Sequence, residues 1–566
     1  MFINTLKKRF VFIVLFLCIS FVIYFICFYP IYFSKNIIIS FAIHPFNIYS
    51  KYPNGWLLIK KLSLITLFFS NIIISNFLYS IWIKKTKDKN LSLNFVSDID
   101  ENSLNLNIGL DLNNTPIFIS EKGLFQNILI TGTIGSGKTS SAMYPFTEQI
   151  IKFKNLDKSK KIGMLILDVK GNYYKQVYSY CKKYNRLNDL KIIELGGKIK
   201  YNPLDKPNLK ASILANRLKT ILTLFSNNNG ESFWLDKVEQ ILTESIKLCR
   251  LYNQGYVSFV EIHKLITVSG YYKEKLSILR EEFVSGKFSK SDCYNLLSAI
   301  DFFEKEFDKL DDRTLAILKS EITRITGAFV SDIDILNTFC PLKSDINFFG
   351  FKDVIQKGQI VVLNMNISEY RNLSKIIAAY LKLDFQTEIM MNLTNNSQRI
   401  FSFICDEYHE YVTSTDADFF AQSREANCIN IVATQSYTSL LNTLNNKYTV
   451  NAITQNLVNK IWYRTDDIFT IEEAQKQIGK EEKIKFSESI SENSKQTTFN
   501  YLTKNFNSLD STLSESINRY SQVDFIYDTK YFTQTLEVFH SLCFLSNGNK
   551  IIPPQELKMI PYFKKL

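Results

Sequence analysis

The pattern of apolar and polar positions divides the chain into an apolar N-terminal region and a longer region in which apolar and polar segments alternate. Residues 10–29 and 62–83 form two uncharged apolar runs. Each is long enough to cross a membrane as a helix, which takes roughly 20 residues. No small-residue cleavage site follows the first run, which favours a retained anchor over a removable signal peptide. The pattern therefore predicts two transmembrane helices within residues 1–90.

The distribution of basic residues predicts the orientation of these two helices. Basic residues gather before the first run and after the second: Lys7, Lys8, Arg9, Lys84, Lys85, Lys87 and Lys89. Since positive charge favours the cytoplasmic side of a membrane, we expect both ends of this region in the cytoplasm and a short loop outside. Two buried core helices are the alternative interpretation of the same runs.

Short, continuous apolar runs in the rest of the chain predict strands that are buried on both faces. These runs cover residues 115–120, 127–131, 161–169, 190–195, 357–365, 399–407 and 428–435. Helix-like segments follow several of them, such as residues 374–393, and this alternation predicts a mostly parallel sheet with helices on both faces. We assign residues 91–205 and 347–566 to one α/β domain, which ends in a strand pair around an Asn-Gly turn.

Residues 206–346 lack strand-like runs and show a helical period instead. One face of the segment after the NNNG turn is apolar, formed by Leu235, Val238, Ile241, Leu242 and Ile246. We therefore predict an all-α domain inserted into the α/β domain. Residues 487–521 are rich in Ser, Asn and Thr and are expected to form a surface excursion.

Composition and charge change this picture only slightly. A formal net charge of +12 over 566 residues fits a membrane protein with basic cytoplasmic flanks, and it fits a protein that binds a polyanion. The nine cysteines form no CxxC pair, so neither a disulfide framework nor a zinc site is expected. We therefore expect most of the chain to lie in a reducing compartment.

The segment GTIGSGKTS matches the G-x-x-x-x-G-K-[ST] pattern of a phosphate-binding loop, between an apolar strand and a segment compatible with a helix. Backbone N–H groups of such a loop point at phosphate oxygens. Lys138 is expected to reach the β- and γ-phosphates, and Thr139 to bind Mg²⁺. The residues predicted to bind ATP are Gly132, Thr133, Gly135, Ser136, Gly137, Lys138, Thr139 and Ser140. A glycine-rich turn without a ligand is the alternative.

A second motif, the acidic segment CDEYHEY, lies at the end of the apolar run 399–407. Asp406 is expected to hold Mg²⁺ together with Thr139, mainly through water, and Glu407 to polarise the attacking water. An Asp-Glu pair that only opens a helix is the alternative, since carboxylates suit that position.

The next apolar run ends in Gln435, and we expect its strand to lie beside the strand that precedes the phosphate loop. The Gln435 amide would then be placed to sense the γ-phosphate. Arg424 stands eleven residues earlier. It is either a solvated charge at the end of a helix or a finger that reaches the nucleotide of a neighbouring subunit.

In their order and spacing, these features resemble the coupling proteins of type IV secretion, the conjugative TraG/TraD class of ATPases. The resemblance extends to an Asp168-x-Lys170-Gly171 turn, to the NPL segment that begins at Asn202, and to ESFWLDKVEQILTESI at the start of the helical insert. The usual proline of the family is Val169 here, and no small-residue run follows CDEYHEY. These two departures leave the subfamily open.

The resemblance implies a RecA-like P-loop NTPase domain with an inserted all-α domain, preceded by the two transmembrane helices. It implies a homo-hexamer in the plasma or inner membrane, with the N-terminus and the ATPase domain in the cytoplasm. The implied partners are single-stranded DNA bound without sequence preference, relaxase or relaxosome proteins, and components of the secretion channel. ATP hydrolysis would drive transport, with Gln435 as the nucleotide sensor and Arg424 acting in trans. A DNA translocase of the FtsK or HerA kind, or a nucleotide-binding substrate receptor with little turnover, are the alternatives.

Overall fold

The computed structural model of the chain describes residues 102–225, 232–286, 288–395, 399–492, 498–500, 505–507 and 513–564, together with residues 16, 18, 20, 65, 68–75, 77 and 78. The chain forms two units, Met1–Ile99 and Asp100–Leu566. Most of the two predicted transmembrane runs lies outside the described residues; residues 68–75 of the second run are helical. Where the structure describes the chain, it contains no helix with the length and apolar character needed to cross a membrane.

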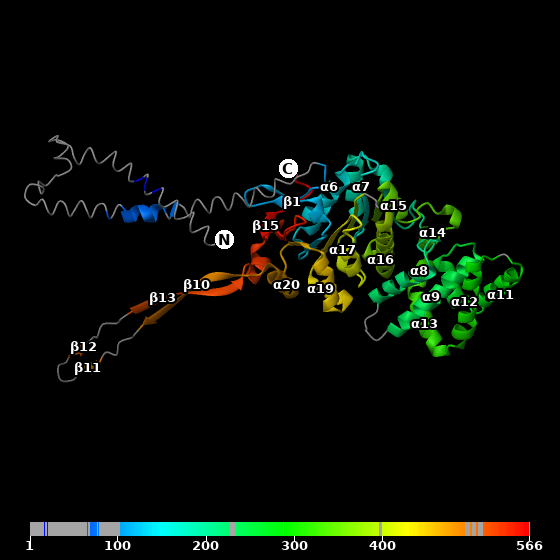
Figure 1. Cartoon of the computed structure of the whole chain (residues 1–566). Helices are drawn as coiled ribbons and strands as arrows, with labels where there is room; N and C mark the ends of the chain where they lie inside the picture. The colour runs from blue at the N-terminus through cyan, green and yellow to red at the C-terminus, as the bar shows by residue number, and fades with distance from the viewer. Residues whose placement is uncertain are drawn as a thin grey trace, which may run out of the picture. The chain divides into compact units, whose positions relative to one another are not determined.

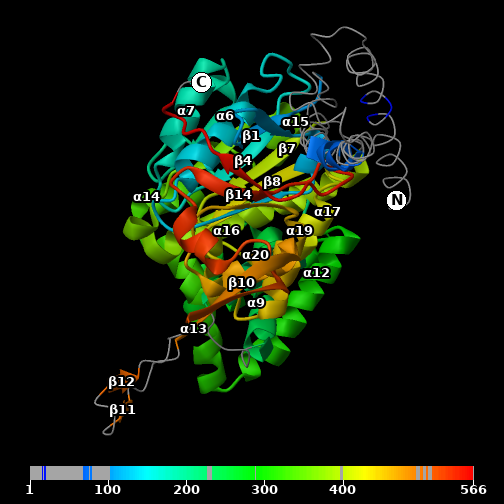
Figure 2. The ribbon, with the colours of Figure 1, turned by 90° about the vertical axis from the view of Figure 1, so that its left-hand side faces the viewer.

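One sheet of eleven strands organises the described part of the second unit, in the order β2-β1-β15-β14-β9-β3-β8-β7-β4-β6-β5 (Figures 1 and 2). The strands from β9 to β5 in this order are parallel, as predicted. Their bounds are β9 Asn459–Trp462, β3 Ile128–Thr131, β8 Cys428–Thr434, β7 Phe401–Cys405, β4 Gly163–Leu167, β6 Ile360–Leu363 and β5 Leu190–Ile193.

Four antiparallel strands extend the sheet beyond β9. They are β14 (His540–Phe544), β15 (Gln555–Lys558), β1 (Leu106–Leu110) and β2 (Pro116–Ile119). β14 pairs with β15, and the Asn-Gly turn lies between them, next to an isolated bridge between Ser546 and Ile551. The last part of the chain thus belongs to the same sheet as the strand before the phosphate loop.

Helices cover both faces of the parallel strands, which explains why these strands read as continuous apolar runs. All residues of β3, β4, β6, β7, β8 and β9 are buried. Figure 2 shows α6 and α7 on one side of the strands and α16, α17 and α19 on the other. The helices around the sheet are α5 Glu121–Leu124, α6 Tyr144–Lys152, α7 Tyr173–Lys183, α15 Lys352–Lys357, α16 Ile367–Met391, α17 Asp416–Gln422, α18 Tyr437–Leu444, α19 Lys447–Asn456 and α20 Ile468–Ile478.

Helices alone make up the regular structure described between β5 and β6. Besides α15, they are α8 Ala211–Leu222, α9 Ser232–Tyr252, α10 Phe259–Thr267, α11 Tyr271–Val284, α12 Lys290–Asp301, α13 Asp312–Val330 and α14 Ile333–Phe339, joined by short helical turns. The apolar face predicted for the segment after NNNG is buried in α9, from Leu235 to Ile246. Figure 1 shows α9, α11, α12 and α13 gathered away from the sheet. The division of the chain at residues 90, 205 and 346 remains a prediction.

A long antiparallel ribbon occupies the region predicted as a surface excursion. It consists of β10 (Lys480–Glu492) and β13 (Leu513–Phe525), and a short pair, β11 (Thr498–Asn500) and β12 (Asn505–Asn507), follows toward its tip (Figure 1). The sequence did not indicate strands here, because Ser, Glu and Lys occupy many positions of the ladder.

Candidate nucleotide-binding site

The predicted phosphate loop connects the end of β3 to a helical segment that begins at Thr139 and continues as α6. Gly135 and Gly137 have φ values of 79° and 102°, a region that residues with a Cβ rarely adopt. A Cβ on Gly137 would also lie 2.6 Å from the Phe539 ring. The glycines therefore permit both the curvature of the loop and the close approach of a neighbouring segment.

The Lys138 side chain folds back over the loop. Its Nζ donates hydrogen bonds to the carbonyl oxygens of Gly132 at 2.5 Å and Thr133 at 3.2 Å. Burial lowers the pKa of the Lys138 ammonium group, while the carboxylates of Glu407 and Asp406 act in the opposite direction. The cation thus lies inside the curve of the loop, where a phosphate oxygen would replace the carbonyl oxygens as its partner.

The structure brings Thr139 and Asp406 into direct contact. The Thr139 hydroxyl donates to Oδ2 of Asp406 at 2.8 Å, and Oδ1 accepts the N–H of Glu407 at 3.0 Å. Burial raises the pKa of Asp406 to about 6, and the charges of Glu407 and Asp168 add to this effect. A hydroxyl and a carboxylate next to a phosphate loop fit Mg²⁺, which binds through one or two carboxylates together with substrate phosphates.

Glu407 follows Asp406 in a left-handed backbone conformation, with φ 48° and ψ 48°. Bulky residues adopt this region at an energetic cost, and such strain is concentrated at functional sites. The residue is 8% exposed. Within the part of the chain that the structure describes, no group forms a hydrogen bond with its buried Oε2, and Nδ1 of His409 lies 3.7 Å away. This oxygen is available to accept a hydrogen bond from water.

A fully buried ion pair holds the turn that carries Glu407. Nζ of Lys382, on α16, lies 2.6 Å from Oδ2 of Asp416, the first residue of α17. Lys382 also donates to the carbonyl oxygen of Tyr411 at 2.7 Å, and the Tyr408 hydroxyl donates to Asp416 at 2.5 Å. Burial lowers the pKa of Lys382, whereas Asp416 raises it. The residue after Glu407 is therefore anchored to the start of α17.

Gln435 lies at the phosphate loop, but Arg424 does not. β8 is the parallel neighbour of β3, as predicted, and the carbonyl oxygen of Gln435 accepts the N–H of Gly132 at 3.3 Å. Arg424 is exposed and precedes the opposite end of β8. Seven strand residues at about 3.3 Å each separate the two ends by roughly 23 Å. The structure thus keeps Arg424 away from the loop of its own chain.

The two further motifs of the resemblance form turns. The carboxylate of Asp168 accepts the N–H groups of Lys170, Asn172 and Tyr173 at 3.1–3.2 Å and so caps the start of α7. Asn202 donates from its side chain to the carbonyl oxygen of Val257 at 2.8 Å and connects the α/β part to the helical region.

The C-terminal part of the chain also contacts the phosphate loop, which the sequence analysis did not indicate. The N–H of Phe539 donates to the carbonyl oxygen of Ser136 at 3.2 Å, and the N–H of Tyr562 to that of Ser140 at 2.9 Å. Aromatic residues near the end of a chain have no motif that would identify them as part of a nucleotide site.

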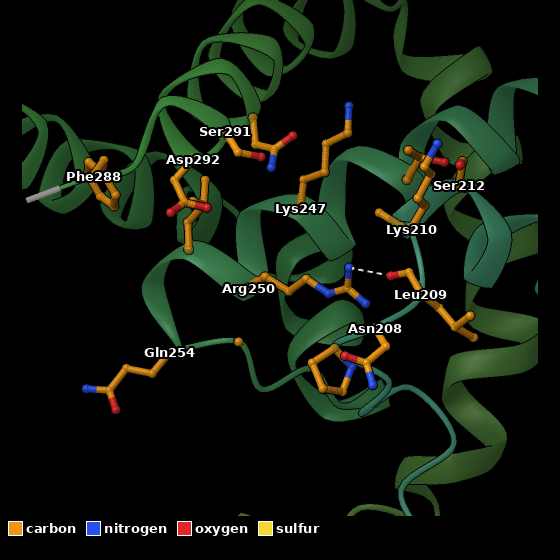
Figure 3. Close-up of a pocket in the computed structure, with 16 residues that line it drawn as sticks. Asn208, Leu209, Lys210, Ser212, Lys247, Arg250, Gln254, Phe288, Ser291 and Asp292 are labelled. Carbon is orange, nitrogen blue, oxygen red and sulfur yellow. Dashed lines mark hydrogen bonds between the residues drawn. The ribbon is translucent and has the colours of Figure 1, made fainter. Parts of the chain in front are cut away.

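A pocket in the helical region is lined by residues of α9, α12 and the start of α8 (Figure 3). Lys247 pairs with Glu244 at 2.7 Å. Arg250 donates to the carbonyl oxygens of Leu209 and Lys206 at 2.8 Å each. Lys247 and Arg250, two cations that line the pocket, are thus bonded to other groups of the protein, and we assign no ligand to this pocket.

Comparison with known proteins supports a relation to type IV secretion. Residues 321–511 match the family model of the type IV secretion-system coupling protein DNA-binding domain. This match confirms the resemblance to coupling proteins, and it includes Asp406, Glu407, Arg424 and Gln435 but not the phosphate loop. No curated protein matches the chain.

Several solved structures are similar to the chain. The bacterial conjugative coupling protein TrwBdeltaN70 is 11% identical, with 83% of this chain and 91% of that chain covered and a TM-score of 0.50. The plasmid coupling protein TrwB in complex with ADP and Mg²⁺ is 12% identical, with 80% and 89% covered and a TM-score of 0.49. VirB4 of Thermoanaerobacter pseudethanolicus is 14% identical, with 81% and 97% covered and a TM-score of 0.45. The first of these matches shows that the chain has the mixed α/β fold of TrwBdeltaN70.

Proposed function

We propose that this chain is a membrane-anchored ATPase that couples DNA or relaxase–DNA complexes to a type IV secretion channel and uses ATP hydrolysis to drive their transport. One observation carries the nucleotide part of the proposal: the hydrogen bond between Thr139 and Asp406, which joins the phosphate loop to the acidic end of β7. The family match over residues 321–511 supports the type of substrate, because the family is described as a coupling protein domain that binds DNA.

Each polar group of the site has a role in this proposal. The loop from Gly132 to Ser140 binds the phosphates through its N–H groups, and Lys138 exchanges its carbonyl partners for the β- and γ-phosphates. Thr139 and Asp406 hold Mg²⁺, which when bound neutralises charge on the phosphates. Glu407 accepts a hydrogen bond from the attacking water through Oε2, which has no hydrogen-bond partner among the described residues, and orients that water.

Gln435 and Arg424 act at the two ends of β8. The backbone of Gln435 contacts the loop, so a change at the γ-phosphate is transmitted directly to β8. Arg424 is exposed and roughly 23 Å from this point, so it serves a neighbouring subunit of a hexamer rather than its own nucleotide.

The remaining parts of the proposal concern the membrane and the client. Residues 10–29 and 62–83 form two transmembrane helices, with the N-terminus and the ATPase domain in the cytoplasm. A ring of subunits with a net charge of +12 each binds single-stranded DNA through its phosphates, without reading its sequence. Relaxosome proteins and channel components are the expected protein partners.

Hydrolysis assays on the full chain in detergent test the proposal. Glu407→Gln should bind ATP but lower hydrolysis by about 10²–10⁴, the usual contribution of a general base. Lys138→Ala should lose both binding and hydrolysis. Glu281→Gln, the same change at an exposed site of the helical region, is the matched control. Full hydrolysis by Glu407→Gln would refute the assigned role, and a wild type that binds ATP without DNA-stimulated hydrolysis would favour a substrate receptor.

A further inference from the structure

The C-terminal segment crosses the phosphate loop at two points. The backbone bonds from Phe539 and Tyr562 reach Ser136 and Ser140, the residues on either side of the segment that contains Lys138 and Thr139. A third bond, from the N–H of Met559 to the carbonyl oxygen of Phe539 at 2.7 Å, ties the two crossing points together.

Phe539 is held against the loop in an unfavourable backbone conformation. Its φ of 65° lies in the left-handed region, where a bulky residue is an outlier. The surrounding structure imposes this conformation, since the N–H and the carbonyl oxygen of Phe539 are both bonded and its ring occupies the space that a side chain at Gly137 would need. Such strain next to a ligand loop indicates a position with a functional constraint.

An aromatic cluster continues from Phe539 along the segment. The ring centroids of Phe539 and Phe563 are 6.1 Å apart, those of Phe563 and Tyr562 are 5.4 Å apart, and Tyr562 contacts Tyr144 of α6 at 5.2 Å. Tyr562 and Phe563 are nevertheless 42% and 59% exposed. Two large rings are thus held beside a phosphate loop with much of their surface open to a ligand.

The direction of a bound nucleotide along the loop places its base near these rings. In such a loop the backbone N–H groups hold the α- and β-phosphates and Lys138 reaches the β- and γ-phosphates, so the nucleoside end lies on the side away from the γ-phosphate. Ser140 is the second residue of the helical segment after the loop, and its carbonyl oxygen accepts the N–H of Tyr562. Planar bases stack on aromatic side chains, because every base has a π-face.

We propose that Tyr562 and Phe563 form the base subsite of the nucleotide site, with Phe539 holding the segment on the loop. The ligand is a nucleoside triphosphate whose base stacks on these rings. This inference rests on the proposed function, which supplies the triphosphate but assigns no group to the base. The competing explanation is that the C-terminal segment only supports the phosphate loop as a brace. A brace would affect the binding of a ligand without a base as much as the binding of ATP.

Binding of ATP and of inorganic tripolyphosphate to the detergent-solubilised full chain, both with Mg²⁺, separates these explanations. The double variant Tyr562→Ala/Phe563→Ala should bind ATP about ten- to a hundredfold more weakly, the usual value of base stacking, while its affinity for tripolyphosphate stays unchanged. Phe563→Leu, which keeps apolar volume but removes the π-face, should weaken only ATP binding and provides a milder second variant. Tyr448→Ala, at an aromatic residue 86% exposed on α19, is the matched control for both ligands.

Each result has a distinct meaning. Equal weakening of ATP and tripolyphosphate binding would overturn the inference in favour of a brace. Unchanged ATP binding in both variants would also overturn it, because no base contact would have been lost. A wild-type chain that binds neither ligand would instead refute the proposed function itself.

Discussion

Replacing Asp406 with Asn is expected to stabilise the nucleotide-free protein while it removes hydrolysis. Asp406 is 1% exposed, and burial, with Glu407 and Asp168, raises its pKa to about 6 from an ordinary 3.8. At 1.36 kcal/mol for each pH unit, this difference corresponds to about 3 kcal/mol of lost stability at neutral pH. Asn has the same shape: its oxygen accepts the N–H of Glu407, and its NH₂ donates to the Thr139 hydroxyl, which also accepts.

The dependence of this gain on pH identifies its cause. Between about pH 4 and pH 6, folded wild type keeps a proton on Asp406 that the unfolded chain has released, so its stability falls as the pH rises through this window. The variant has no such titration. Its advantage should therefore be near zero below about pH 4 and should reach about 3 kcal/mol above pH 7.

Urea unfolding without nucleotide and with EDTA, followed at pH 4 and pH 8, measures this difference. Asp466→Asn, the same change at an exposed position, should alter stability little at either pH. If Asp406→Asn is less stable than wild type at pH 8, the buried carboxylate does not destabilise the folded protein. A gain of equal size at both pH values would show that its charge is not the cause.

Three other predictions concern the support of the site, its assembly and the membrane anchor. Lys382→Met should cost about 3–5 kcal/mol of unfolding free energy, because Asp416 stays buried without its cation; adding Asp416→Asn should restore part of this in urea unfolding, and no recovery would contradict the ion-pair argument. Arg424→Ala should lower hydrolysis by about 10³–10⁵ with ATP binding kept, and rings mixed with Glu407→Gln subunits should regain activity; mixed rings that assemble but remain inactive would return Arg424 to a solvated charge. A reporter fused after residue 90 should be cytoplasmic and one inserted near residue 45 external, and the reverse pattern would reject the predicted topology.

The sequence predicted the parallel sheet and the residues that gather at its edge for one physical reason. Strands covered by helices on both faces must be apolar throughout, so β3, β7 and β8 are visible as continuous runs. Parallel strands present their carboxyl ends at the same edge, so the motifs after β3 and β7 meet although 267 positions separate Thr139 from Asp406. The register between Thr131 and Thr434 then places Gln435 beside the loop.

Two strands of the same sheet, β9 and β1, were not predicted, because polar residues occupy positions in them. β9 includes Lys460, which is 3% exposed and donates to the carbonyl oxygens of Thr454 and Leu457. β1 lies in a segment where asparagines alternate with apolar residues, so it does not form a continuous apolar run. In β9, backbone carbonyls thus satisfy a polar group that hydrophobic periodicity counts against a buried strand.

The buried charged residues that support the site could not be predicted from the sequence for a related reason. Lys382 and Asp384, two positions apart on α16, are both fully buried. Lys382 pairs with Asp416 behind Glu407, whereas Asp384 pairs with Arg217 of α8 at 2.8 Å. A charged residue in a helical sequence is ordinarily solvated, and only a partner from a distant segment makes its burial possible. The sequence pattern identifies a helix at α16 but not these partners, because residues from Ile376 to Gln386 are buried all round the helix. The link that α16 makes between the turn of Glu407 and the helical region therefore follows from the fold alone.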